Sequence, residues 1–247
     1  MAFDYTNYKQ VEYLLADAST SQTMRGPYID LGLAGGYYRY VCKGYWTKTS
    51  QYVQALFGGF QSYANDYARL NTSSTTVRYD VRGQNKTIAN VALNTDHLFE
   101  FCSDPDNAYM SIDGNTQTLA VGGSSFTAPN RLLFAYNQNG TPSGVSSFKM
   151  YYFKIYDLND DLVMDLVPAQ QRSSPNKYGM YDTIGETFYG TQNSYDFTGG
   201  PEVSGGPETY VKIGGTWKKA DAVYVKVGGT WTEGSMNVKV SGSWKDS

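Results

Sequence analysis

The sequence is poor in the residue types on which many catalytic and metal sites depend. It has one histidine, His97, and two cysteines, Cys42 and Cys102, among its 247 residues. A structural zinc site needs three or four nitrogen or sulfur ligands, so these three side chains cannot build a closed one. A Ser-His-Asp or Cys-His site would depend on His97 alone. Because His97 lies in an apolar run, we expect a strand-end residue with a local hydrogen bond.

Charge and long apolar runs are also scarce. Charged residues make up 17% of the chain, the net charge is -3 and no basic run stands out, which argues against a nucleic-acid partner. No apolar stretch reaches the roughly 18 residues of a membrane span, so no membrane segment is predicted. The first residues lack the basic and apolar regions of a signal peptide. We therefore expect a mature secreted chain or a protein released by another route, such as lysis.

The two cysteines leave two alternatives open. Cys42 and Cys102 both lie within strand-like runs, where they could form a disulfide between neighbouring strands. The other alternative is two small buried thiols, which the sequence favours because cysteine is often buried without pairing.

Glycine and tyrosine are abundant instead, with 26 and 23 residues. Tyrosine suits pleated surfaces and glycine supplies positive φ in tight turns, so this composition favours strands over a helical bundle. Apolar and polar residues alternate in short runs bounded by Gly, Asn, Asp and Ser, as in half-buried antiparallel strands. These runs are 11–16, 28–32, 38–45, 52–60, 76–81, 86–92 and 97–102. The prediction is an all-β protein.

Two turns can be placed from their residues. Asp113-Gly114 favours a primed hairpin turn, which matches the twist of the strands around it. Residues 137–142 predict an exposed loop between strands near 132–135 and 148–156.

The chain changes character after Gly200. Glycine and proline mark residues 201–209 as a linker, and 210–247 then hold three copies of one short unit. Each copy predicts a strand, a glycine-centred turn and a return strand that carries a tryptophan. Because one such unit cannot bury its own apolar face, the copies must pack on each other or on a partner. Trp217, Trp231 and Trp244 therefore form either a small core or a docking and oligomer contact.

The order of motifs in the first 200 residues resembles laminin-G-like, concanavalin A-like jelly rolls of bacterial and phage surface proteins. Segments 11–14 and 27–32 resemble the opening of such a domain. The most specific match is to its closing strands, in 162–168, 179–182, 188–189 and 197–199. Between them lie further matching segments, namely 97–101, 111–114, 132–135 and 148–157. The tryptophan repeats resemble short modules appended to phage tail and fibre proteins.

The resemblance implies a two-sheet antiparallel jelly-roll sandwich in residues 1–200, followed by the linker and a small β-repeat tail. It also raises the possibility of a glycoside hydrolase, since laminarinase-like relatives carry Glu-x-Asp-x-x-Glu or a close variant on one strand. No such pattern occurs, and the nearest acidic groups, around Asp104 and Asp157, fall where turns are expected. The two carboxylates that glycoside hydrolysis requires are thus missing from the expected strand, and we predict no enzyme.

Calcium is the one cofactor for which the sequence offers ligands, although we expect none. The candidates lie in one turn, at Asp157, Asn159, Asp160 and Asp161. A calcium loop would carry a glycine at its sharp bend and a bidentate glutamate at its end, and both are absent. An ordinary polar hairpin turn is therefore favoured.

A sugar site needs an aromatic platform with polar side chains beside it. Three segments have that mixture, at 37–38, 45–46 and 63–69, and the residues singled out are Tyr45, Trp46, Tyr63, Asn65, Asp66, Tyr67 and Arg69. The alternative is that these aromatic side chains only pack the faces of a tyrosine-rich sandwich.

Together these observations predict a non-enzymatic component of a phage virion, assembled in the host cytoplasm and extracellular after lysis. Its jelly roll would bind cell-surface glycans or other bacterial or mucosal surface ligands. The repeats would contact other virion proteins or further copies in a homo-oligomer. The alternatives are a purely structural capsid or tail decoration protein and a glycoside hydrolase.

Overall fold

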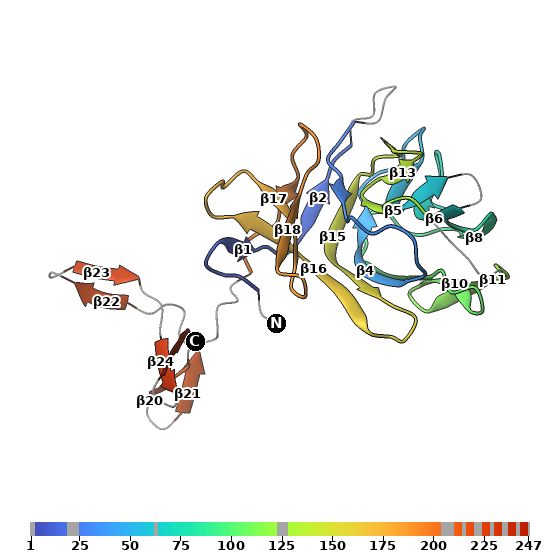
Figure 1. Cartoon of the computed structure of the whole chain (residues 1–247). Helices are drawn as coiled ribbons and strands as arrows, with labels where there is room; N and C mark the ends of the chain where they lie inside the picture. Colours follow the sequence, from blue (N-terminus) through green and yellow to red (C-terminus); the bar gives the residue numbers. More distant parts are fainter. Residues whose placement is uncertain are drawn as a thin grey trace. The chain divides into compact units, whose positions relative to one another are not determined.

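The computed structural model divides the chain into two compact units, Met1–Val203 and Ser204–Ser247. It describes residues 3–18, 25–61, 64–122, 128–203, 210–213, 216–219, 224–227, 230–233, 237–240 and 243–246, with side chains up to residue 203. In these residues the regular structure is all strand (Figure 1). No helix in the described part of the chain is long and apolar enough to cross a membrane.

The first unit is a sandwich of two sheets. In the larger sheet the order is β11-β10-β9-β4-β15-β16-β17-β18, with β1, β2 and β19 attached beside this path, and every strand pair is antiparallel. Its strands are β1 (Tyr8–Gln10), β2 (Leu14–Ala16), β4 (Arg39–Trp46), β9 (His97–Cys102), β10 (Ala108–Ile112), β11 (Asn115–Leu119), β15 (Phe148–Tyr156), β16 (Leu162–Gln171), β17 (Tyr178–Asp182), β18 (Thr187–Gly190) and β19 (Thr198–Gly199).

The smaller sheet has the order β14-β13-β5-β6-β7-β8, with β12 attached at β5 and β3 attached at β12. Its pairs are antiparallel except that β13 joins β5 in parallel. Its strands are β3 (Ile29–Asp30), β5 (Gln54–Gln61), β6 (Ala64–Leu70), β7 (Val77–Val81), β8 (Gln84–Ile88), β12 (Leu132–Leu133), β13 (Tyr136–Gln138) and β14 (Thr141–Ser143). The predicted all-β, two-sheet jelly-roll sandwich is confirmed.

Alternation along each strand decides which side chains enter the core. In β4, Tyr40 and Cys42 are buried, whereas Arg39, Val41 and Lys43 are half-buried on the outer face. A period of two residues produces this division, because successive side chains on a strand point to opposite faces of the sheet.

The core is aromatic and joins the two sheets. Phe57 of the smaller sheet packs on three rings of the larger sheet. Ring-centroid distances are 4.3 Å to Tyr40, 5.4 Å to Phe101 and 5.5 Å to Phe153. All four side chains are fully buried, so their burial stabilises both sheets at once.

Two-residue turns close several hairpins. Asp113 and Gly114 have φ of 52° and 83°, the positive values that a type I′ turn requires, which confirms the predicted primed turn. The exposed loop predicted over 137–142 is wrong in part, because β13 and β14 form a hairpin there. Asn139 and Gly140 have φ of 50° and 88°. An Asn-Gly pair adopts such angles readily, so two residues suffice for the turn.

Both cysteines are buried free thiols, as the sequence favours. They lie on adjacent strands but out of register, since Cys42 is opposite Phe99 and Cys102 is opposite Arg39. Three positions along a strand amount to about 10 Å, too far for a disulfide. Burial raises the pKa of the Cys42 thiol.

The first unit ends three residues beyond the predicted end of the jelly roll. Residues 201–203 extend along the N-terminal segment, where Glu12 donates its backbone N–H to the Pro201 carbonyl and Val203 donates to that of Gln10. Lys9 pairs with Glu202 at 2.9 Å. Residues 204–209 of the predicted linker lie outside the described residues.

In the second unit each repeat contains a two-stranded antiparallel sheet. The strands are β20 (Tyr210–Ile213) with β21 (Thr216–Lys219), β22 (Tyr224–Val227) with β23 (Thr230–Glu233), and β24 (Asn237–Val240) with β25 (Ser243–Asp246). The register is the same in all three, with the tryptophan opposite the lysine of the first strand.

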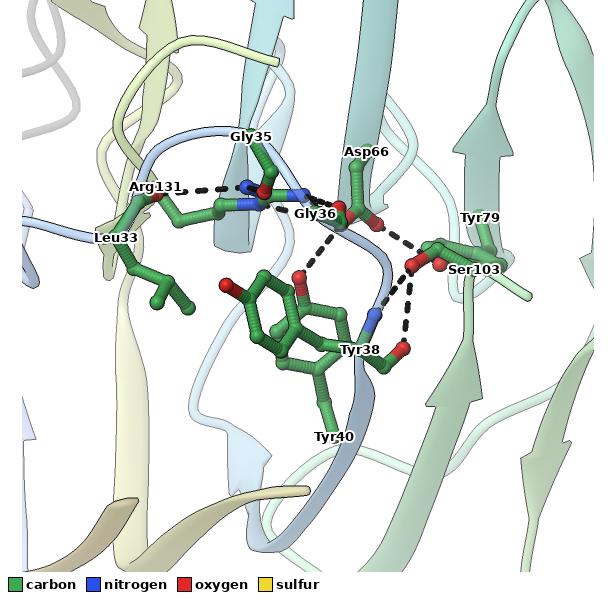
Figure 2. Close-up of polar contacts among 9 residues, drawn as sticks. All are labelled: Leu33, Gly35, Gly36, Tyr38, Tyr40, Asp66, Tyr79, Ser103 and Arg131. Carbon is green, nitrogen blue, oxygen red and sulfur yellow. Dashed lines mark hydrogen bonds and ion pairs between the residues drawn. The ribbon is translucent and has the colours of Figure 1, made fainter. Parts of the chain in front are cut away.

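A buried carboxylate links the two sheets (Figure 2). Asp66 of β6 accepts hydrogen bonds from the hydroxyls of Tyr40, in the larger sheet, at 2.6 Å and Tyr79, in the smaller sheet, at 2.8 Å. Arg131, just before β12, donates from Nη2 to the same carboxylate at 2.9 Å. Both charged side chains are 0% exposed. Each oxygen therefore has a donor, which a buried charge needs to be tolerated.

The rest of the Arg131 guanidinium fixes the segment before β4. It donates to the backbone carbonyls of Gly35 and of Gly36, the latter at 2.9 Å, and it lies 5.2 Å from the Tyr38 ring centroid. Carbonyl oxygens and a carboxylate thus surround the guanidinium (Figure 2).

Replacement of Arg131 should strongly destabilise the jelly roll. Arg131→Met leaves the Asp66 carboxylate buried without its counter-charge, so we expect a loss of about 3–5 kcal/mol in the free energy of unfolding. Urea denaturation measures this. Lys177→Met removes an exposed ion pair, 3.4 Å long and 55% exposed on both sides, and should change stability by about 0–1 kcal/mol. An Arg131→Met effect no larger than the Lys177→Met effect would contradict the role given to this pair.

The buried tyrosines predict a cooperative alkaline transition. Burial raises the pKa of Tyr40 and of Tyr79 well above the usual value, and the Asp66 charge raises them further. A raised folded-state pKa stabilises the fold below the unfolded pKa of about 10, and this contribution is lost as pH rises further. In a titration of tyrosinate absorbance, exposed tyrosines should ionise gradually and the buried ones only together with loss of near-ultraviolet circular dichroism. Gradual ionisation of all 23 tyrosines with the fold intact would refute this.

Candidate functional site

Strand β6 divides the predicted sugar-site residues between its two faces. Asp66 points into the core, whereas Asn65, Tyr67 and Arg69 alternate onto the outer face of the smaller sheet. Asn65 accepts a hydrogen bond from the Gly83 N–H at 2.7 Å and is 5% exposed, so it holds the β7–β8 turn. Tyr63 lies outside the described residues.

Asp66 cannot contact a ligand in this structure, so its prediction as a ligand-binding residue is wrong. It is 0% exposed and its carboxylate is occupied by Tyr40, Tyr79 and Arg131. Its position on β6 is the reason, because the alternation that carries Tyr67 outward carries Asp66 inward.

Trp46 is also a core residue, which corrects its prediction as a sugar platform. It is 1% exposed and packs edge-on against Phe99 at 5.4 Å and Phe148 at 4.8 Å. It follows Tyr40 and Cys42 on the inward side of β4, and this period of two residues was visible in the sequence. The indole Nε1 is buried without a hydrogen-bond partner.

Tyr45 points outward, but from the larger sheet, so the structure does not bring it together with the β6 residues. The Lys149 ammonium lies 5.4 Å from the Tyr45 ring, 3.7 Å from the Tyr13 ring and 5.1 Å from the Tyr151 ring. Burial acts to lower the pKa of Lys149, yet hydrogen bonds to Tyr151 and Tyr45 and their partial charges raise it overall. Cation–π contacts within the protein therefore engage these rings.

The outer face of the smaller sheet carries a different group of side chains, which we call the arginine–tyrosine surface. It consists of Phe60 of β5, Tyr67 and Arg69 of β6, Arg78 and Asp80 of β7, and Tyr136 of β13. Tyr136 stacks on Tyr67 with a centroid distance of 5.1 Å and an interplanar angle of 26°. Phe60 meets Tyr67 edge-on at 5.8 Å. Phe60 and Tyr136 are half-buried, so part of each ring reaches solvent.

A glycine allows Tyr67 its position. Gly58 lies opposite Tyr67 in the β5–β6 pair and has φ of +139°, which L side chains rarely adopt. A Cβ atom at residue 58 would lie 2.1 Å from the Tyr67 Cβ. The aromatic group therefore depends on glycine at this position.

The charged side chains of this surface are unequally paired. Asp80 binds Arg78 through two hydrogen bonds, Nε to Oδ2 at 2.8 Å and Nη2 to Oδ1 at 2.5 Å. The Asp80 hydrogen bond raises the pKa of Arg78. Arg69, directly opposite Arg78, reaches Asp80 only at 3.9 Å, beyond hydrogen-bond distance. Its Nε is buried without a hydrogen-bond partner.

Tyr67 stays neutral across the physiological range. Burial, together with the Asp80 charge, raises the pKa of its hydroxyl to about 12. Its ring also lies 5.2 Å from the Arg69 Cζ atom. This arrangement offers ring faces for the apolar face of a ligand and guanidinium donors for its oxygen atoms.

Four of these residues were missed in the sequence, for different reasons. Arg78 and Asp80 lie two apart in an alternating run, and Phe60 ends another, so strand periodicity could have placed them on a shared face. The position of Tyr136 on this face could not be predicted from periodicity, because β13 pairs in parallel with β5, a strand far from it in the sequence.

The calcium candidates form a hairpin turn in which Asp157 and Asp160 use side-chain oxygens in contacts within the protein. Asp157 Oδ1 accepts the backbone N–H of Asn159 at 2.8 Å and of Asp161 at 3.0 Å. Asp160 pairs with Arg39 at 2.9 Å. Among the described residues no group of three or more His, Cys, Asp or Glu side chains is placed to hold a metal ion. The polar-turn alternative accounts for these residues.

His97 has the local contacts that the sequence predicts. It is the first residue of β9, and its Nδ1 lies 2.6 Å from Asp113 Oδ2 and its Nε2 lies 3.0 Å from the Ala92 carbonyl. Burial acts to raise the pKa of Asp113, but hydrogen bonds from His97 and the Leu98 N–H outweigh it and lower the pKa. His97 thus ties the start of β9 to the β10–β11 turn.

Trp217, Trp231 and Trp244 lie on β21, β23 and β25. Their side chains are outside the described part of the structure, so their role as a docking or oligomer contact remains a prediction.

Comparisons with known proteins find likeness in structure only. No protein-family model matches the sequence, and no curated protein matches it. Among solved structures, a Bacteroides ovatus protein described as a candidate carbohydrate-binding protein aligns with 11% identity and a TM-score of 0.51. The alignment covers 76% of this chain and 59% of that one, so the chain spans less than two thirds of its length.

Two further structures align at lower scores. The CBM40 domain of the Ruminococcus gnavus IT-sialidase, bound to α2,3-sialyllactose, has 14% identity and a TM-score of 0.41 over 62% of this chain and 94% of that one. Domains LG4-5 of the mouse laminin α1 chain have 14% identity and a TM-score of 0.42, and the alignment covers 74% of this chain and 50% of that one. The likeness to the Bacteroides structure supports the jelly-roll fold and leaves the ligand open.

Substitution of Trp46 should affect stability rather than ligand contact. Trp46→Ala removes a large core side chain, and we expect a loss of about 3–5 kcal/mol in the free energy of unfolding. Trp46→Phe keeps an aromatic ring and removes the unpaired indole N–H, so it should cost clearly less. Urea denaturation of both variants measures the difference. Equal stability of Trp46→Ala and the unmodified protein would show that Trp46 is not a core residue.

Proposed function

We propose that the jelly roll is a non-catalytic carbohydrate-binding domain and that the arginine–tyrosine surface is its binding site. The observation that carries this proposal is the group of rings around Tyr67. The partly exposed rings of Phe60 and Tyr136 pack on it, and the Arg69 guanidinium, whose Nε has no hydrogen-bond partner among the described residues, lies 5.2 Å from it. Aromatic faces suit the apolar face of a sugar ring, and guanidinium groups suit its oxygens. The description of the similar Bacteroides structure as a candidate carbohydrate-binding protein supports the same ligand class.

The surface favours binding over hydrolysis. A glycoside hydrolase of the common type uses two carboxyl groups on either side of the scissile bond. Asp80 is the one carboxylate among the residues of this surface, and Arg78 occupies both of its oxygens. The neighbouring Asp66 faces the opposite side of the sheet. The two acidic groups are therefore not placed to share a substrate.

At the level of the whole chain, we propose a phage virion component that displays this domain toward glycans of the bacterial cell or its surroundings. The basis is the likeness of the tail to repeats of phage tail and fibre proteins. Trp217, Trp231 and Trp244 would hold the repeats against other virion proteins or against further copies of the chain. The competing proposal is a decoration protein of purely structural role.

A bacterial-glycan array tests the binding function and its site together. The full chain should bind a defined subset of glycans, and Tyr136→Ala should weaken that binding about tenfold, because a ring that stacks on the sugar is lost. Tyr195→Ala is the matched control, since Tyr195 is an exposed tyrosine that is not among the residues of this surface. Thermal unfolding of both variants shows whether they remain folded.

A blank array from folded protein would contradict the carbohydrate proposal and favour the structural role. Binding that survives Tyr136→Ala at full strength would place the site elsewhere on the molecule.

A further inference from the structure

Arg69 is a largely buried cation whose one contact with a carboxylate in the described residues is long, 3.9 Å from Nε to Asp80. Its side chain is 18% exposed and its Nε is buried without an acceptor. A buried donor without a partner costs free energy, and more so when the group is charged. An arginine in this state favours an acceptor from outside the chain, which has to approach through the exposed part of the side chain because Nε itself is buried.

The charges around Arg69 leave a local positive excess. Arg69 and Arg78 lie directly opposite each other on β6 and β7, an arrangement that is unfavourable for like charges. Asp80 compensates one of them, and its oxygens are both taken by Arg78. The remaining charge on Arg69 is notable in a chain whose net charge is -3.

We propose that the sugar bound at the arginine–tyrosine surface is an acidic one and that its carboxylate binds the Arg69 guanidinium. This inference rests on the proposed carbohydrate-binding function. The planar guanidinium fork matches a carboxylate through two parallel hydrogen bonds, and a neutral hydroxyl would leave the buried charge uncompensated. The ligand class is therefore a saccharide that contains a uronic or nonulosonic acid.

Neighbouring residues supply the contacts that the rest of such a sugar needs. Tyr136 and Phe60 present apolar surface against the Tyr67 ring, whose centroid lies 5.2 Å from the Arg69 Cζ atom. On the next strand, Asn85 lies opposite Asp80 and Thr87 opposite Arg78, so both occupy the same face, and both are exposed. Their amide and hydroxyl groups are suited to sugar hydroxyls at the edge of the site.

The test compares each acidic glycan with its carboxyl-reduced, neutral counterpart on the full chain. Bacterial and host glycans that contain uronic or nonulosonic acids are printed beside the reduced forms, with sulfated neutral glycans as a third set. We expect the acidic forms to bind about tenfold more tightly or better, because a charge-assisted pair is lost on reduction. Their binding should also weaken as the salt concentration rises.

Arg69→Gln locates the effect. It should weaken binding of an acidic glycan by about the same factor as reduction of the carboxyl group does, and should leave binding of the reduced glycan unchanged. Arg172→Gln, at an exposed arginine outside this surface, is the control. The comparison of acidic with reduced glycans on the unmodified protein needs no variant, so it holds even if Arg69→Gln fails to fold.

The outcomes separate this inference from the function on which it rests. Equal binding of acidic and reduced glycans, or preference for the sulfated set, would refute the inference that Arg69 binds a sugar carboxylate. It would not refute carbohydrate binding as such. If Arg69→Gln weakens binding of the acidic and the reduced glycan equally, Arg69 contacts the sugar at another group than its carboxylate. This result also refutes the inference. The absence of binding to any glycan by folded protein refutes the proposed function itself.

Discussion

The Asp66 carboxylate is the interaction on which the jelly roll depends. It accepts hydrogen bonds from a tyrosine of each sheet and from Arg131, and all of these groups are buried. A charge in this position is tolerated only while its donors stay in place, so the two sheets and the segment before β4 are held in one arrangement. Strand β6 of the smaller sheet, which carries Asp66, is thereby fixed to the larger sheet.

The fixed strand presents Tyr67 and Arg69 on its other face, so residues of the core and residues of the proposed binding site alternate along β6. Arg131 in the core and Arg69 on the outer face differ in how their hydrogen-bond donors are used. Arg131 donates to a carboxylate and to backbone carbonyls, whereas Arg69 lies within reach of a carboxylate that is already occupied. Rigid support beneath an unsatisfied group is the arrangement that favours binding, because little order has to be gained when the ligand arrives.

Cationic side chains on the outer face of the larger sheet have partners within the protein. Arg39 pairs with Asp160, Lys43 with Asp96 and Lys154 with Asp165, at 2.9, 3.1 and 3.4 Å. Lys149 lies against tyrosine rings instead. Arg69 differs from them, since it is more buried than any of these paired side chains and its Nε has no hydrogen-bond partner among the described residues.

Strand periodicity made much of the fold predictable, and the same periodicity explains two errors. The sequence predicts a strand over 38–45, and the sugar-site prediction places Trp46 on the surface although this residue continues the inward series of Tyr40 and Cys42. The same prediction groups Asp66 with Tyr67 because they are adjacent in sequence, whereas adjacent strand residues face opposite sides. The pairing of Asp66 with Arg131, 65 residues apart, and the stacking of Tyr136 on Tyr67 depend on tertiary contacts that no local pattern encodes.

A crystal structure of the full chain with a bound acidic oligosaccharide tests the central claim most directly. The account predicts a saccharide on the outer face of the smaller sheet, its ring against Tyr136 and its carboxylate within hydrogen-bond distance of Arg69. A saccharide bound on another face, or an Arg69 guanidinium that is hydrogen-bonded to the protein itself while the ligand lies elsewhere, would contradict it.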